Sequence, residues 1–113
     1  MPLYTPLLFL FLGSSMKESK FQRRLIRRIK KRFPGAIVMK NDANYIQGIP
    51  DLTILYKDCW ATLECKNKKE ASHQPNQDYY VKKMSEMSYS AFVYPENELQ
   101  VLKDLDILFN KNK

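Results

Sequence analysis

Cysteine, histidine and glycine are scarce in this sequence, and their scarcity excludes whole classes of protein. Among 113 residues there are two cysteines, one histidine and three glycines. Cys59 and Cys65 fall in one strand-like stretch, where steps of about 3.3 Å would separate them by roughly 20 Å. A disulfide needs Cα atoms within about 7 Å, and these few residues form no zinc-ligand spacing. We therefore predict two reduced thiols and a cytoplasmic location.

Long hydrophobic runs are missing as well. Residues 7–12 form a short apolar run, whereas a membrane-spanning helix needs about 20 such residues. No Lys or Arg precedes Lys17, so this end lacks the positive region of a secretory signal. We expect residues 1–15 to be a loose or extraneous leader, with a packed extra element or a signal peptide as alternatives. Residues 16–113 are expected to form a single domain, and no membrane partner is predicted.

Acidic residues are outnumbered, and the imbalance is local. Nineteen Lys and Arg residues face twelve Asp and Glu residues, giving a net charge of +7 and a pI near 9.4. Residues 17–32 contain nine of the basic residues and a single acid, Glu18. A domain this basic is expected to bind a polyanion, either nucleic acid or an anionic membrane surface.

The hydrophobic pattern predicts an α/β domain with the element order α-β-β-β-α-β-α. Turn residues at Phe33-Pro34-Gly35 end the first helix, and a tight turn at Lys57-Asp58 joins two strands into a hairpin. A mixed sheet flanked by helices is therefore expected. The predicted helices cover 16–33, 75–88 and 98–109, and the predicted strands cover 36–40, 51–57, 59–66 and 90–94.

The first predicted helix has one apolar stripe and a basic opposite arc. Glu18 falls at the centre of the stripe, where a carboxylate is costly unless it is paired or metal-bound. Compensation of the helix N-terminus is the alternative role. Few acids stand four residues away to pair with the basic arc, so we expect it to contact phosphates, with a solubilising surface as the alternative. The predicted contacts are Arg23, Arg24, Arg27, Arg28, Lys30 and Lys31.

Two acids and a lysine form the constellation that carries chemistry. Asp51 opens one strand of the expected hairpin, and Glu64 and Lys66 share a face of the other, because alternate side chains point the same way. Close carboxylates repel one another unless a proton or cation lies between them, and oxygen ligands favour Mg²⁺. Such an ion would polarise a phosphodiester, with Lys66 orienting a water molecule or stabilising charge. The carbonyl of Cys65 is a further candidate ligand.

Simpler interpretations exist for each of these residues. Asp51 could be a turn acid, and Glu64 with Lys66 a solvated ion pair. Other residues have weaker signals. Gln77 shares a predicted inner helix face with Val81, Met84 and Ser88. Asn44 and Tyr45, with Asp42, are candidate DNA contacts in an otherwise ordinary loop. His73 is expected at the surface, and Met84 and Met87 in the core.

The segment Gly48-Ile49-Pro50-Asp51 with Glu64-Cys65-Lys66 resembles the PD-(D/E)xK nuclease signature. The element order is similar to the restriction-endonuclease-like α-β-β-β-α-β core of that superfamily, here with a C-terminal helix. A leading helix with an acid at its start, and a Gln after the second strand of the hairpin, resemble the VRR-NUC family in particular. The resemblance covers about residues 16–95.

This resemblance implies a Mg²⁺-dependent DNA endonuclease, with Mn²⁺ as a substitute and no organic cofactor. It implies a preference for branched, flap or four-way junction DNA, a homodimer, and a location in the host cytoplasm if the gene is phage-borne. It also implies residue roles. The implied metal ligands are Asp51, Glu64, Cys65 and Glu18, the catalytic lysine is Lys66, and the helix-two glutamine is Gln77, with Gln74 as the alternative.

Two other functions compete with this interpretation. A non-catalytic nucleic-acid-binding module with a nuclease-like fold would bind DNA without needing Asp51. A membrane-surface protein would use residues 16–33 as a basic amphipathic anchor. The apolar stripe of that helix lacks Trp and carries Glu18, which disfavours the second of these.

Overall fold

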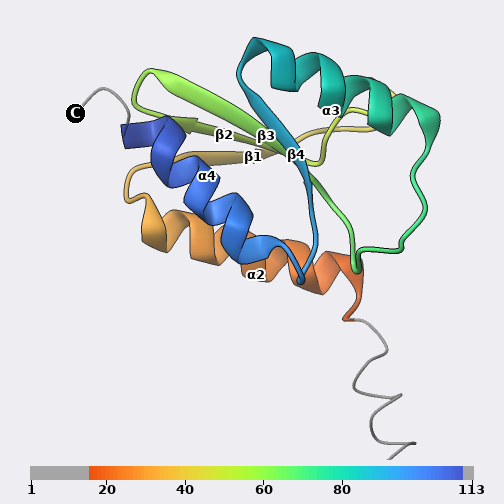
Figure 1. Ribbon diagram of the computed structural model, residues 1–113, viewed down its shortest axis with the longest axis horizontal. Coiled ribbons are helices and arrows are strands. Elements are labelled where there is room, and N and C mark those ends of the chain that lie inside the picture. Colours follow the sequence, from red (N-terminus) through yellow and green to blue (C-terminus); the bar gives the residue numbers. More distant parts are fainter. Residues whose placement is uncertain (1–15, 111–113) are drawn as a thin grey trace, which may run out of the picture.

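A four-stranded sheet with helices on both faces is built by residues 16–110, the part of the chain that this computed structural model describes (Figure 1). The predicted leader 1–15 and residues 111–113 lie outside the described residues. The order of elements matches the prediction, with bounds that shift slightly. The elements are α2 (Glu18–Arg32), β1 (Ile37–Lys40), β2 (Leu52–Tyr56), β3 (Cys59–Cys65), α3 (Pro75–Met87), β4 (Tyr89–Val93) and α4 (Glu98–Asn110).

The sheet is mixed, as predicted. Its strand order is β1-β2-β3-β4, with antiparallel pairing on both sides of β2 and parallel pairing between β3 and β4. The expected hairpin turn is present, and Lys57 in it has a φ of 57°. A parallel pair needs a crossover connection, and α3 supplies it between β3 and β4. Helix α3 therefore begins at the end of the sheet where β3 finishes and returns the chain to the opposite end, where β4 starts.

Helices α2 and α4 cover one face of the sheet, and α3 covers the β3–β4 part of the other (Figure 1). Strand alternation follows this arrangement. Ala61, Leu63 and Cys65 are fully buried on the α2–α4 side, whereas Thr62 and Glu64 face α3. Cys59 and Cys65 are not joined by a disulfide, in agreement with the predicted reduced thiols. Within residues 16–110, no helix has the length and apolar character needed to cross a membrane.

The apolar stripe of α2 forms much of the core. Phe21, Leu25 and Ile29 are fully buried and Phe33 nearly so. Each such side chain contributes about 1.5–3 kcal/mol when it leaves water. At the far end, the ring of Phe33 packs against those of Tyr56 and Phe109, with centroids 5.6 and 5.0 Å away. These contacts fasten α2 to the hairpin and to α4.

The predicted core position of Met87 is wrong. Its side chain is 66% exposed, because it stands on the last turn of α3 and on the flank of the inner stripe. Met84 is half-buried and accepts a long contact from the Thr62 hydroxyl at 3.4 Å. Helix α3 therefore packs through Val81 and Met84 and leaves its final turn in solvent.

Two glycines with positive φ provide a matched test of the packing near α3. Gly35 has a φ of 94° and open space around it, whereas Gly48 has a φ of 89° and abuts the backbone and side chain of Asn76. We expect Gly35→Ala to cost about 1–2 kcal/mol from backbone strain. Gly48→Ala should cost about 1–3 kcal/mol more, because the new Cβ would overlap Asn76. Urea unfolding of both variants measures the difference, and equal losses would contradict the close contact.

Candidate active site

Asp51 and Glu64 meet at the end of the β2–β3 hairpin. The antiparallel register places Leu52 opposite Leu63, so Asp51, which directly precedes β2, falls beside Glu64. The Asp51 side chain turns towards β3, where its Oδ2 atom accepts a hydrogen bond of 2.9 Å from the backbone N–H of Cys65. The predicted approach of the two carboxylates is therefore present, and strand pairing fixes it.

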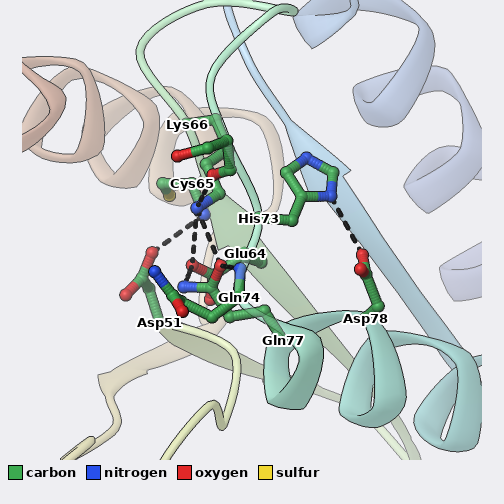
Figure 2. A network of polar contacts seen from close by, with 9 residues as sticks. Asp51, Glu64, Cys65, Lys66, His73, Gln74, Gln77 and Asp78 are labelled. Atoms are coloured by element: carbon green, nitrogen blue, oxygen red, sulfur yellow. Dashed lines mark hydrogen bonds and ion pairs between the residues drawn. The ribbon is translucent and has the colours of Figure 1, made fainter.

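Gln77 connects Glu64 to Lys66. Its Nε2 donates to Glu64 Oε2 at 2.9 Å, and its Oε1 accepts from Lys66 Nζ at 2.8 Å (Figure 2). The same Oε1 also accepts from the backbone N–H of Gln74 at 3.0 Å, as part of a capping box at the start of α3. Gln77, and not Gln74, thus contacts the acid and the lysine, while Gln74 serves as the N-cap.

Lys66 is held from several directions. Besides Gln77, its Nζ donates to the carbonyl oxygen of Ser72 at 3.0 Å and lies 3.9 Å from Glu64 Oε2. The residue is only 7% exposed. A buried ammonium needs such acceptors, and these fix its position beside the carboxylate.

The loop that carries Ser72 is fastened by the histidine next to it. The His73 ring stacks on Phe92, with centroids 3.9 Å apart. Its Nδ1 lies 2.9 Å from Asp78 Oδ1 (Figure 2). The sequence offered no signal for these partners, because α3 and β4 bring them together only in the fold. His73 is exposed as predicted, but it is not without contacts.

Burial and their mutual repulsion disfavour the charged forms of the two acids. Burial, and then the charge of Asp51, raise the pKa of Glu64 to about 8 against the opposing effect of Lys66. Burial also raises the pKa of Asp51. Glu64 Oε1 is buried and has no partner with full hydrogen-bond geometry among the described residues, although the nearby backbone N–H of Asp51 lowers the pKa of Glu64 somewhat. Since a buried oxygen without a full partner is costly, this oxygen is suited to bind a cation.

Glu18 corrects one prediction. Its side chain is exposed, not buried, because the first turn of α2 extends beyond the strands that cover the rest of the apolar stripe. The charges of the site nevertheless act on the Glu18 carboxyl. Partial desolvation and the charge of Asp51 raise the pKa of Glu18, while Lys66 lowers it. Glu18 is therefore near enough to influence the pair without sharing its burial.

The donor set fits a magnesium ion better than a softer metal. In residues 16–110 no three His, Cys, Asp or Glu side chains are grouped to hold a metal. The side-chain donors are thus the carboxylates of Asp51 and Glu64, and Mg²⁺ is often bound by one or two carboxylates while keeping several waters. The Cys65 thiol points into the core, where burial raises its pKa, so it remains protonated.

The basic arc of α2 is partly neutralised, contrary to the expectation of unpaired charges. Glu98 of α4 binds Arg24 at 3.0 Å and Arg28 at 2.8 Å, and Asp106 binds Arg32. These acids lie about 70 residues further along the chain, so local spacing could not reveal them. The residues without such a partner from α4 are Arg23, Arg27, Lys30 and Lys31, and all are exposed.

The loop before β2 is also exposed. Asn44 and Tyr45 lie in a turn in which the Asp42 carboxylate accepts a hydrogen bond of 2.8 Å from the backbone N–H of Asn44, and Tyr45 is 85% exposed.

Comparison with known proteins gave no match: no family model fits the chain, and no curated protein or solved structure matches it. What the site can do follows from its geometry.

The raised pKa of Glu64 predicts how stability depends on pH in the metal-free protein. The folded state keeps this proton up to about pH 8, whereas the unfolded chain releases it near pH 4.5. The folded state therefore binds more protons between these values, and the free energy of unfolding should fall as the pH rises from 5 to 8. One unit of pKa difference corresponds to about 1.4 kcal/mol.

Thermal melts at several pH values in EDTA test this expectation. Glu64→Gln should flatten the decline, because the amide cannot ionise, whereas Glu70→Gln, at an exposed acid in the loop after β3, should leave it unchanged. A decline that persists in Glu64→Gln would assign the pH dependence to another group.

Proposed function

We propose that this chain is a Mg²⁺-dependent endonuclease that hydrolyses phosphodiester bonds of DNA. The observation that supports this most directly is the buried carboxylate of Glu64, which feels the charge of Asp51, has one oxygen without a side-chain partner, and has its other oxygen 3.9 Å from Lys66 Nζ. The element order and mixed sheet support a restriction-endonuclease-like topology of the VRR-NUC kind. The surplus of positive charge supports a polyanionic substrate.

Asp51 and Glu64 would hold the ion, with the carbonyl of Cys65 as a further oxygen ligand and Glu18 acting on its water shell. When bound, Mg²⁺ supplies Lewis acidity to the phosphodiester and lowers the pKa of a bound water. The chain supplies orientation. Gln77 fixes the second oxygen of Glu64, and the hydrogen bond from Cys65 fixes Asp51. Both carboxylates are therefore aimed before the ion arrives.

Lys66 supplies a positive charge at a fixed point. Because Ser72 and Gln77 accept two of its three N–H bonds, the remaining donor can be directed at a phosphate oxygen or at the attacking water. A preorganised cation stabilises charge that develops in the transition state without the cost of reorganisation. Branched DNA as the preferred substrate, a homodimer, a phage origin and a cytoplasmic location belong to the same proposal.

Cleavage of a labelled four-way junction and of a linear duplex tests the proposed function. With Mg²⁺ or Mn²⁺ we expect cleavage that EDTA abolishes. Lys66→Ala and Asp51→Asn should lower kcat by about 100-fold or more, the size of effect found when a preorganised charge is removed. Lys68→Ala is the matched control, since Lys68 is exposed in the following loop, and it should retain activity.

The competing function is a non-catalytic nucleic-acid-binding module. It would bind DNA in a salt-sensitive way, and Asp51→Asn would leave this binding unchanged or strengthen it. A well-folded protein that binds but cuts neither substrate with either metal would favour this alternative and refute the nuclease.

A further inference from the structure

A cleft with a volume of about 670 Å³ opens between α2 and α4, and its lining does not include Asp51 or Glu64. Four cationic side chains and one acid line it, together with apolar atoms of Leu99, which is 70% exposed. The charged lining residues are Arg24, Arg28, Lys31, Arg32 and Glu98. The cleft is therefore positively charged, and its wall on the α4 side is partly apolar.

Glu98 organises two of these cations. It is 2% exposed, and its two oxygens bind Arg24 and Arg28 separately. One carboxylate cannot neutralise two guanidinium groups, and each group carries five N–H donors. The buried acid thus fixes both arginines on the cleft wall and leaves a surplus positive charge with donors for another anion. At the C-terminal end of α2, Asp106 forms a separate, partly exposed ion pair with Arg32.

Helix α2 joins this cleft to the candidate active site. Glu18 in its first turn feels the charge of Asp51, and the cleft-lining residues follow further along the same helix. At about 1.5 Å per residue, Arg24, Arg28 and Lys31 lie roughly 9, 15 and 20 Å beyond Glu18 along the axis. Phosphates in one strand of a duplex are about 3.4 Å apart along its axis. A phosphate backbone that ran along α2 from the active site would therefore pass these cations about three to six base pairs from the bond that is cut.

We propose that the cleft between α2 and α4 binds the phosphate backbone of the nucleic acid on one side of the scissile bond. This inference rests on the proposed function for the position of that bond. The cleft would bind only the substrate backbone, and the hydrolysis itself would take place at Asp51 and Glu64. The Glu98-held arginines provide a rigid anion site, and Lys31 adds an exposed, mobile charge at its rim.

Salt dependence of DNA binding tests the site without requiring cleavage. Lys31→Ala removes a rim charge and leaves the Arg24–Glu98–Arg28 group intact, so folding should be unaffected. Lys83→Ala is the matched control, because it removes one exposed lysine, from α3, that does not line the cleft. Binding of a labelled duplex in EDTA is measured by anisotropy over a range of salt concentrations. The slope of log K against log salt should fall by about 0.9 in Lys31→Ala, as expected for one lost phosphate contact.

The control should keep the wild-type slope. Equal losses in both variants would mean diffuse attraction to the whole protein, and no loss in Lys31→Ala would mean that the cleft does not bind DNA. Either result would overturn the proposal.

A second measurement locates the contact relative to the cut. Cleavage substrates are lengthened by six base pairs on one side of the mapped cut or on the other. In the wild type, KM should fall about tenfold for one side only, and Lys31→Ala should lose most of this gain while kcat stays constant. Gains on both sides, or a gain that Lys31→Ala keeps, would reject the one-sided contact. Absence of any cleavage would refute the nuclease, while the salt slopes would still decide whether the cleft binds DNA.

Discussion

The burial of Glu64 is the constraint on which the arrangement of the site depends. A carboxylate that is 2% exposed on the inner side of a strand must be protonated, paired or bound to a cation. One of its oxygens has Gln77 and Lys66 as neighbours, and the other has no partner with full hydrogen-bond geometry among the described residues. Asp51, directly before the adjacent strand, adds a second carboxylate whose charge repels that of Glu64. The hydrogen bonds around these side chains hold this unfavourable grouping in place, and such a grouping is most simply explained by a functional role.

The fold supplies that grouping from separate parts of the chain with short connections. The hairpin register sets the two acids side by side. The crossover between the parallel strands β3 and β4 begins with the N-terminus of α3 at the same end of the sheet. The capping box of α3 then aims Gln77, because its Oε1 must reach the backbone of Gln74. Gly48 allows the loop before Asp51 to lie against Asn76 in the first turn of this helix. Gln77 thus caps the N-terminus of α3 and also orients Glu64 and Lys66 in the site.

Sequence periodicity was sufficient for the elements and for the central residues, because both depend on local rules. Alternation along 59–66 set Glu64 and Lys66 on one face, and the apolar stripe predicted for the first helix is the buried side of α2, with Phe21, Leu25 and Ile29. It failed where tertiary contacts decide. Glu18 follows the stripe of its helix but lies beyond the strands, and Met87 stands on a final turn that nothing covers. The Ser72 carbonyl and the His73 stack could not be predicted, since neither a backbone acceptor nor a ring pair across the fold leaves a pattern.

Glu98 is the most instructive omission, since it changes the meaning of the basic helix. Taken alone, α2 is a row of mutually repelling cations, which would destabilise it. Two acids of α4 remove part of that repulsion, and they do so at Arg24, Arg28 and Arg32 rather than uniformly. The outer residues Arg23, Arg27 and Lys30 are exposed, and no acid of α4 pairs with them. The helix therefore combines fixed arginines near α4 with mobile cations elsewhere. A carboxylate pair at one end of the helix and a cationic surface further along it are consistent with the proposed function, in which a metal ion would neutralise the first and a polyanionic substrate the second.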